Sequence, residues 1–588
     1  MMALRHAIPP DTLAAQTRAA DPGVTAWVSA NAGSGKTHVL TQRVIRLLLA
    51  GTPPSKILCL TFTKAAAANM SLRVFDTLSK WTTLDDAALE SEIRKTGAPF
   101  ALTDLAFARR LFARTVETPG GLKIQTIHAF CERLLHLFPF EANVASHFRV
   151  IEDVERAELL QEARDKALAL ALEDEAGPLG AALNKISGQT SADDFDDLLE
   201  AVLAKRDKLM RGIEALGGDL ARYESALRNA LDIKTNRSAA ELEEDITEGG
   251  LPPSNWLDYA ARLDQGSSND KGAADRLRKA VGASGKARRD AYEKVFLTDK
   301  NTPRTTLVTA KLDKADPGLK DALVNEQLRI CAARELLKSV ESLERSAALL
   351  RIAAQILRSY AAMKNARALL DFDDLIEITR RLLAGAAASW VLYKLDSGID
   401  HILVDEAQDT SPGQWDILRA LAEEFMAGEG QRSLTRTFFA VGDEKQSIYS
   451  FQGAQPDQFD NMRRLFESRA REAELDFASV PLQLSFRSAP GILACVDAVF
   501  ADAGNRRGLV YGDDVNTEHR ALKSDLPSVV EIWPLVGARD TTEERDWKLP
   551  VDLQDKHDPP AILARRIAAM ISDWLQPTSK ERVCDENG

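Results

Sequence analysis

The residues whose types and spacing most plainly carry chemistry lie near the start of the chain, in Ser29-Ala30-Asn31-Ala32-Gly33-Ser34-Gly35-Lys36-Thr37. Glycines let the backbone curl so that several N–H groups face one anion, and a helix N-terminus adds partial positive charge. Lys36 is suited to β- and γ-phosphates and Thr37 to Mg²⁺. The segment predicts a phosphate-binding loop. A plain glycine turn between a strand and a helix is the alternative.

A second segment, far along the chain, has the acidic chemistry that such a loop requires. The apolar run His401-Ile402-Leu403-Val404 is typical of a buried strand, and Asp405 and Glu406 follow it. Asp405 is placed to hold Mg²⁺, and Glu406 is placed to polarise an attacking water. Carboxylates often stand where a strand ends, so the pair gains its meaning from the glycine loop, since phosphoryl transfer needs both halves.

Polar and aromatic residues follow two later strand-like runs. Gln446, after the run at 437–441, is placed to sense a γ-phosphate, and Arg487 is placed to act as an arginine finger across an interdomain cleft. Tyr449 and Phe451 have the spacing to stack on bases. The alternatives are a surface arginine and aromatic packing beneath a loop.

Two more strand ends carry residues suited to a nucleic-acid backbone. Thr61 and Lys64 follow the apolar run at 57–60, and Thr126 and His128 follow the run at 123–125. Hydroxyl, ammonium and imidazole groups near helix N-termini suit phosphate contacts. For His128 a structural role in packing is the alternative.

Three textures indicate how the chain is organised. Residues 1–140 and the part after about 395 alternate apolar strands with helices, whereas 150–365 has helical periodicity and almost no strand signal. We therefore expect an α/β domain interrupted by a helical insertion, with long loops in its polar middle at about 235–320. Near the end, Ile562 to Leu575 predicts an amphipathic helix before a polar tail.

Composition narrows the class further. The chain has 588 residues, 45% of them hydrophobic, and a net charge of −13, which argues against coating nucleic acid by bulk attraction. Its 5 scattered cysteines suggest neither a disulfide framework nor a metal pair, and no apolar run is long enough for a membrane span. A cytoplasmic location is expected. A basic cluster is suited to duplex DNA or is simply a solvated helix face, and it comprises Lys271, Arg276, Arg278, Lys279, Lys286, Arg288 and Arg289.

Taken together, these segments resemble the superfamily 1 helicases of the UvrD/Rep/RecB type. The matching segments, in chain order, are Ala30–Thr37, Thr61–Lys64, Thr126–Phe130, Asp405–Asp409, Gly442–Ala454 and Ser485–Ser488. Leu370-Asp371-Phe372-Asp373-Asp374-Leu375-Ile376 also matches an element of this family. The long interval between Lys36 and Asp405, and the wording around both motifs, is most similar to AddA, the helicase–nuclease component of AddAB.

This resemblance implies a 3′→5′ ATP-dependent DNA translocase or helicase acting in double-strand break repair. It implies ATP and Mg²⁺ as cofactors, single- and double-stranded DNA as ligands, and an AddB-like partner chain. Gln16 and Phe486 would contact the adenine, with the loop Ala30, Asn31, Ala32, Gly33, Ser34, Gly35, Lys36 and Thr37 around the phosphates. Phe62, together with His128, Tyr449 and Phe451, would line the path of single-stranded DNA.

The same resemblance implies a RecA-like domain made of residues 1–145 and 366–475, a helical insertion at 146–365, and an incomplete second RecA-like domain at 476–588. The family's motifs V and VI and the nuclease domain are absent from this sequence, so we expect a chain cut within the second domain. A UvrD/Rep-like repair helicase, or a fragment that binds DNA or a partner without cycling, is the alternative. So is a phosphate-loop ATPase that moves protein or RNA.

Overall fold

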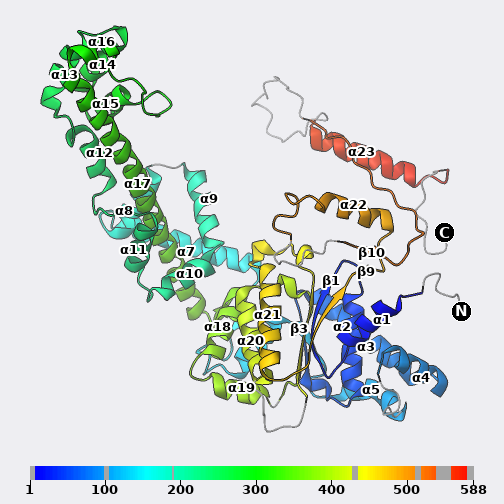
Figure 1. The fold of residues 1–588 in the computed structure, drawn as a ribbon. Helices are drawn as coiled ribbons and strands as arrows, with labels where there is room; N and C mark the ends of the chain where they lie inside the picture. Colours follow the sequence, from blue (N-terminus) through cyan, green and yellow to red (C-terminus); the bar gives the residue numbers. More distant parts are fainter. Residues whose placement is uncertain are drawn as a thin grey trace. The chain divides into compact units, whose positions relative to one another are not determined.

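The computed structural model describes residues 7–98, 105–188, 191–396, 398–426, 435–509, 518–537 and 558–578 of the 588-residue chain. Cys584 and most of the expected polar tail lie outside these ranges. The chain forms two compact units, one made of residues 1–127 and 394–588 and the other of residues 128–393. Figure 1 shows their elements in the colours of the sequence.

The first unit is built on a six-stranded parallel sheet. Its strand order is β3-β2-β6-β7-β1-β8, and every neighbouring pair is parallel. The strands are β1 (Thr25–Ala30), β2 (Ile57–Thr61), β3 (Lys123–Thr126), β6 (His401–Val404), β7 (Thr437–Gly442) and β8 (Phe477–Leu482). The expected α/β class with a parallel sheet is confirmed. Because parallel strands end at one edge, the residues after each strand gather there.

Helices cover both faces of this sheet (Figure 1). Side chains of β1 alternate between the faces: Ala26 and Val28 join a core with Val44 of α2, whereas Trp27 faces α20 and α21. There the Trp27 ring stacks on Trp415 at 5.7 Å. The helices of this unit are α1 (Pro10–Ala19), α2 (Lys36–Leu49), α3 (Lys64–Thr83), α4 (Asp86–Lys95), α5 (Leu105–Glu117), α20 (Pro412–Met426), α21 (Asp457–Glu472), α22 (Pro490–Phe500) and α23 (Pro559–Trp574).

The sheet continues past position 475, where we expected a second domain to begin. Strand β8 pairs with β1 from Thr25↔Phe477 to Ala30↔Leu482. Beyond it, β9 (Leu484–Ser485) and β10 (Arg520–Ala521) form a separate two-stranded parallel pair. Residues 477–482 therefore belong to the first sheet, since their alternating buried pattern places Ala478, Val480 and Leu482 in its core.

The second unit is almost entirely helical, apart from the short pair β4 (Arg149–Val150) and β5 (Leu369–Leu370). Its elements are α6 (Ile127–Leu137), α7 (Asp153–Glu173), α8 (Pro178–Ser187), α9 (Ala192–Leu203), α10 (Arg206–Ala215), α11 (Leu220–Ala230), α12 (Ala239–Glu248), α13 (Trp256–Leu263), α14 (Ser268–Val281), α15 (Gly285–Phe296), α16 (Ala310–Ala315), α17 (Pro317–Ala366), α18 (Phe372–Ala384) and α19 (Ala388–Asp396). The 50-residue α17, about 75 Å long at 1.5 Å per residue, packs on helices that precede it (Figure 1).

The long loops expected at about 235–320 were wrong, because helices α12 to α16 occupy most of that range. Their outer faces are polar, which hid the pattern, but each buries an apolar stripe. Trp256, Leu277 and Phe296 meet Leu323 of α17 in one core. Capping boxes at Ser238 and Ser267 begin two of these helices.

Candidate functional site

The glycine loop joins β1 to α2 in a conformation that needs glycine. Gly33 and Gly35 have φ of +72° and +90°, in the left-handed region. A Cβ on Gly33 would lie 2.7 Å from Arg487 Cβ, and the Gly33 carbonyl accepts a hydrogen bond from Phe486 N at 2.8 Å. Beside them the Ser34 hydroxyl is buried without a hydrogen-bond partner in the described structure. An orphaned hydroxyl in a glycine cradle at a helix N-terminus fits a phosphate group.

Lys36 and the acidic segment meet, although they lie far apart in the chain. Lys36 Nζ forms an ion pair with Glu406 Oε2 at 2.8 Å. Glu406 has φ of +48°, a left-handed conformation that is costly for a residue with a side chain. Its backbone turns sharply after β6, and its carboxylate faces the lysine. The two halves predicted from the sequence therefore share one place at the carboxyl edge of the sheet.

Two carboxyl groups of this segment hold their protons unusually well. Burial, reinforced by the Glu406 charge, raises the pKa of Asp405 to about 6, and the Lys36 charge opposes this. Burial likewise raises the pKa of Asp409 to about 6. A cation placed beside Asp405 would favour its charged form. Asp405 ends β6 and Thr37 lies in the first turn of α2, so both stand at this edge of the sheet.

A chain of hydrogen bonds runs from this ion pair to the loop after β7. Gln408 Nε2 donates to Glu406 Oε2 at 2.9 Å, and Gln408 Oε1 accepts from Asp443 N at 2.9 Å. The Asp443 carboxylate in turn accepts from Gln446 Nε2 at 2.6 Å. The sequence singled out Gln446 but missed Gln408 and Asp443 as connectors. The available signal was that both are polar residues directly after buried strands.

Gln16 and Phe486 converge on the same loop from different elements. A Cβ built on Gly35 would lie 3.5 Å from Gln16 Nε2 and 3.8 Å from Phe486 Cε2. Gln16 comes from α1, and Phe486 directly follows β9. Next to Phe486, Arg487 is exposed with its Cβ over Gly33. The residues that the sequence grouped around a nucleotide thus surround one loop.

The aromatic residues proposed for base stacking form a row in the first unit. The rings of Phe62 and Tyr449 are 4.4 Å apart, and those of Tyr449 and Phe451 are 6.0 Å apart. Phe451 is 77% exposed, so it is not packed beneath its loop. Lys64 is exposed at the first position of α3. Thr61 is buried and donates to the Thr63 carbonyl at 3.0 Å.

Two further candidates are held by packing. Thr126 is buried where β3 ends. His128, in the helical unit, packs edge-on against Phe372 at 5.4 Å, and burial lowers its pKa. These contacts match the structural role that we weighed for His128.

The Leu370–Ile376 segment forms a buried ionic cluster in the helical unit. Asp371 caps α18 and accepts hydrogen bonds from Arg206, Lys364 and Tyr360. Arg206 and Lys364 hold the pKa of Asp371 well below its usual range, although burial opposes them. Asp374 completes the capping box. These contacts give the segment a structural role that joins α10, α17 and α18.

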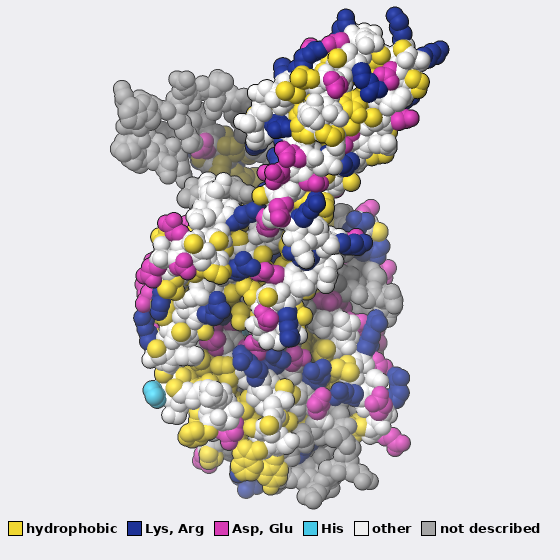
Figure 2. Space-filling model, turned by 90° about the vertical axis from the view of Figure 1, so that its left-hand side faces the viewer, with side chains coloured by type: hydrophobic (Ala, Val, Ile, Leu, Met, Phe, Trp, Pro, Cys, Tyr) yellow, Lys and Arg dark blue, Asp and Glu magenta, His cyan; other side chains and the backbone are white. Residues whose placement is uncertain are grey.

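Much of the basic cluster is neutralised within the helical unit. Arg278 pairs with Asp264 and Asp275, and Arg289 pairs with Glu243. Arg288 lies over the Trp256 ring at 5.0 Å. Positive and negative side chains are interspersed over the face drawn in Figure 2. These contacts favour the solvated helix face over a duplex-binding surface.

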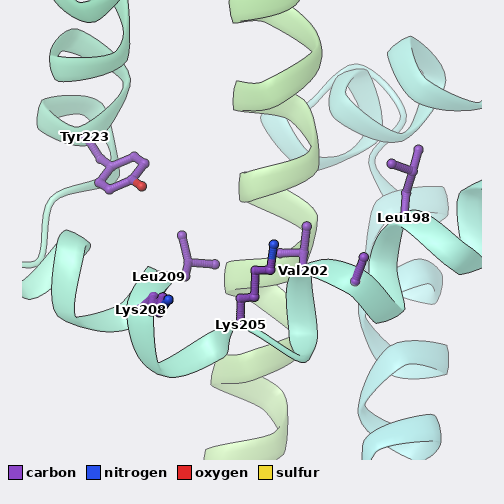
Figure 3. A pocket seen from close by; sticks show the side chains of 7 residues that line it. Leu198, Val202, Lys205, Lys208, Leu209 and Tyr223 are labelled. Atoms are coloured by element: carbon purple, nitrogen blue, oxygen red, sulfur yellow. The ribbon is translucent and has the colours of Figure 1, made fainter. Parts of the chain in front are cut away.

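The helical unit also has an open pocket of about 350 Å³ (Figure 3). Its walls come from α9, α10 and α11, and the residues are Leu198, Ala201, Val202, Lys205, Lys208, Leu209 and Tyr223. Among the described residues, no three His, Cys, Asp or Glu side chains are grouped as a metal site needs. None of the described helices is long and apolar enough to cross a membrane.

Comparison with known proteins places this site in a family. The profile of the UvrD/REP helicase N-terminal domain matches residues 12–467. The chain is 25% identical to an ATP-dependent helicase/nuclease protein of the AddA type from Lactobacillus gasseri, over 87% of this chain and 42% of that protein. For the protein of the same name from Listeria monocytogenes the values are 26%, 81% and 38%, and for that from Pelotomaculum thermopropionicum 27%, 83% and 39%.

The chain thus spans about two fifths of the length of the curated relatives that it matches. The family match covers both the glycine loop and the Asp405–Asp409 segment, the two parts joined by the Lys36–Glu406 ion pair. On the matched sequence and on this geometry together, the chain belongs to the UvrD/REP helicase family and is similar to its AddA-type members.

Proposed function

We propose that this chain is an ATP-dependent 3′→5′ DNA translocase or helicase of the AddA type, acting in double-strand break repair and recombination. The observation that carries the proposal is the continuous route from Lys36 through Glu406 and Gln408 to the loop that bears exposed Phe451. A nucleotide-binding centre and a base-stacking platform are thereby built into one unit. The names of the relatives support both activities.

In this proposal the glycine loop wraps the phosphate chain of ATP, and Lys36 leaves Glu406 to bind the β- and γ-phosphates. Thr37 and Asp405 would hold Mg²⁺, which supplies charge neutralisation when bound. Glu406, freed from the lysine, accepts the proton of the attacking water. Gln446 and Arg487 contact the γ-phosphate, and Gln16 and Phe486 contact the base.

The route from Glu406 to Asp443 gives ATP a way to act on DNA. When Lys36 turns to phosphate, the Glu406 carboxylate loses an ion pair, and its bond to Gln408 becomes its main direct contact. Gln408 holds the backbone of Asp443, and Asp443 holds Gln446. The loop that continues to Tyr449 and Phe451 therefore responds to the state of the nucleotide. Single-stranded DNA would lie along Phe62, Tyr449 and Phe451, with Thr61, Lys64, Thr126 and His128 as further candidates.

We also propose the domain organisation that the family resemblance implies, with a RecA-like domain on the six-stranded sheet, the helical unit as its insertion, and part of a second RecA-like domain after it. An AddB-like partner, duplex DNA ahead of the fork, and a cytoplasmic location at the nucleoid complete the proposal. The relatives are named as subunits of a helicase/nuclease, which supports a partner chain.

The test is ATP turnover by the full chain with and without single-stranded DNA. Lys36→Ala removes the ammonium group that pairs with Glu406, and hydrolysis should fall by at least about 10²-fold, the scale of losing one charge-stabilising group in a transition state. Far-ultraviolet circular dichroism should be unchanged. Turnover by the variant at the wild-type rate would refute the assignment of the site. Equal stimulation by RNA would refute the DNA assignment.

A further inference from the structure

The helix that carries Gln16 is held at its C-terminal end by two arginines of α2. Arg46 Nη1 donates to the Thr17 carbonyl at 2.7 Å, and Arg43 Nη1 donates to the Ala19 carbonyl at 2.9 Å. An α-helix leaves its last four carbonyls without intrahelical partners unless other groups cap them. In α1 the remaining two are satisfied by the backbone just beyond the helix. Every carbonyl of the last turn is therefore occupied.

These arginines are an expensive way to hold a helix. Arg43 is fully buried, and among the described residues no carboxylate forms a direct ion pair with Arg43 or Arg46. Burial lowers the pKa of Arg43 to about 9. Arg43 also donates to the Val24 carbonyl and to Thr437 Oγ1, and lies 5.1 Å from the centre of the Phe439 ring. The negative end of the α1 dipole partly offsets the buried charge.

Helix α2 links the two ends of the nucleotide site. Lys36 begins it, Arg43 stands two turns further on, and Arg46 nearly three. The Gln16 amide, one residue before the carbonyl held by Arg46, lies beside the loop at Gly35. A rigid helix thus carries the phosphate-binding lysine at one end and the clamp on the Gln16 helix at the other.

We propose that Arg43 and Arg46 are positioning residues that set the distance from Gln16 to the phosphate loop, and so determine the preference for adenine over guanine nucleotides. The inference rests on the proposed nucleotide site. A glutamine amide can donate to N7 and accept from the N6 amino group of adenine, whereas guanine presents an acceptor, O6, in place of that amino group. Such a bidentate contact tolerates little displacement, because hydrogen bonds weaken steeply beyond about 3.2 Å.

The experiment compares binding of Mg-ATP, Mg-GTP and Mg-tripolyphosphate to the full chain. The wild-type chain should prefer ATP to GTP. Arg46→Met should reduce the ratio of ATP to GTP affinity roughly tenfold, the scale of one lost hydrogen bond. It should leave tripolyphosphate affinity unchanged, since the loop is untouched. Arg46→Lys, which retains the charge and one donor, should restore part of the ratio.

A matched control is Arg109→Met, which removes an arginine donor from the Leu84 carbonyl at 2.8 Å in the same unit without touching α1. It should leave all three affinities unchanged. In a Gln16→Ala background, Arg46→Met should have no further effect on the ratio, because Arg46 acts through Gln16.

An unchanged ATP-to-GTP ratio in Arg46→Met, alongside its loss in Gln16→Ala, would overturn the positioning role. So would a further loss in the double variant. If the wild-type chain bound none of the three ligands, the nucleotide site itself would be refuted and the positioning role with it. If it bound tripolyphosphate and both nucleotides equally, only the base-reading role would fall.

Discussion

Gln408→Ala should separate ATP hydrolysis from its stimulation by DNA. Gln408 is buried and makes two bonds of 2.9 Å, one to the Glu406 carboxylate and one from Asp443 N. A hydrogen bond to a charged group contributes about 1.5–3 kcal/mol, and a buried N–H left without a partner costs about 1–3 kcal/mol. The alanine variant regains about 1–2 kcal/mol of side-chain entropy. The net destabilisation is about 1–4 kcal/mol, located between the ion pair and the aromatic loop.

The assay is ATP turnover at saturating nucleotide, measured with and without saturating single-stranded DNA, beside thermal unfolding of the same samples. Basal turnover should persist, because Lys36, Asp405 and Glu406 remain in place. Stimulation by DNA should fall about tenfold, which corresponds to about 1.4 kcal/mol of lost coupling.

Gln414→Ala is the matched control for this variant. Gln414 is also a buried glutamine whose Oε1 accepts from a backbone N–H, that of Ser411 at 3.0 Å, but it has no part in the Glu406 route. It should lower thermal stability and keep the stimulation. If Gln408→Ala were stimulated as strongly as Gln414→Ala, the route from ion pair to aromatic loop would carry no coupling.

Two further predictions concern the exposed aromatic residue and a buried histidine. Phe451→Ala should weaken binding of single-stranded DNA by about 1–3 kcal/mol, roughly 5- to 150-fold, with little change in thermal stability, because the ring is 77% exposed. Unchanged affinity in a fluorescence titration would remove Phe451 from the DNA path. Burial, with a smaller effect of the Arg43 charge, lowers the pKa of His401 to about 3. Below about pH 6.5 the unfolded chain therefore binds a proton that the folded chain refuses, and stability should fall with pH by up to about 1.4 kcal/mol per unit down to about pH 3. His401→Asn should reduce that slope in urea unfolding. An identical slope would show that His401 titrates normally in the folded chain.

The sequence predicted those parts of the site that depend on local pattern. The glycine loop, the apolar strands and the polar residues after them are short-range features, and parallel strands bring their ends together. That was enough to expect Lys36 beside the Asp405–Asp409 segment. The roles assigned to Gln16, Phe486 and Arg487 remain predictions, although the three residues adjoin the loop.

The features that the sequence did not reveal depend on tertiary packing. Arg43 is buried, but an arginine in an amphipathic helix is ordinarily expected on the solvent side, and only the arrival of α1 and β7 explains its position. The helices at 239–315 were missed because their polar faces dominate the composition. Gln408 and Asp443 look like ordinary loop residues until β6 and β7 lie side by side.

The position of β1 at the heart of the sheet has a consequence for biosynthesis. Its two neighbours, β7 and β8, begin at Thr437 and Phe477, about 400 residues after β1 has been made. At about 5–20 residues per second, a ribosome needs roughly 20–80 s to supply them. During that interval the strand beside the glycine loop has both edges open, which is the condition that invites wrong pairing. Production of this protein should therefore depend on chaperones that shield nascent strands.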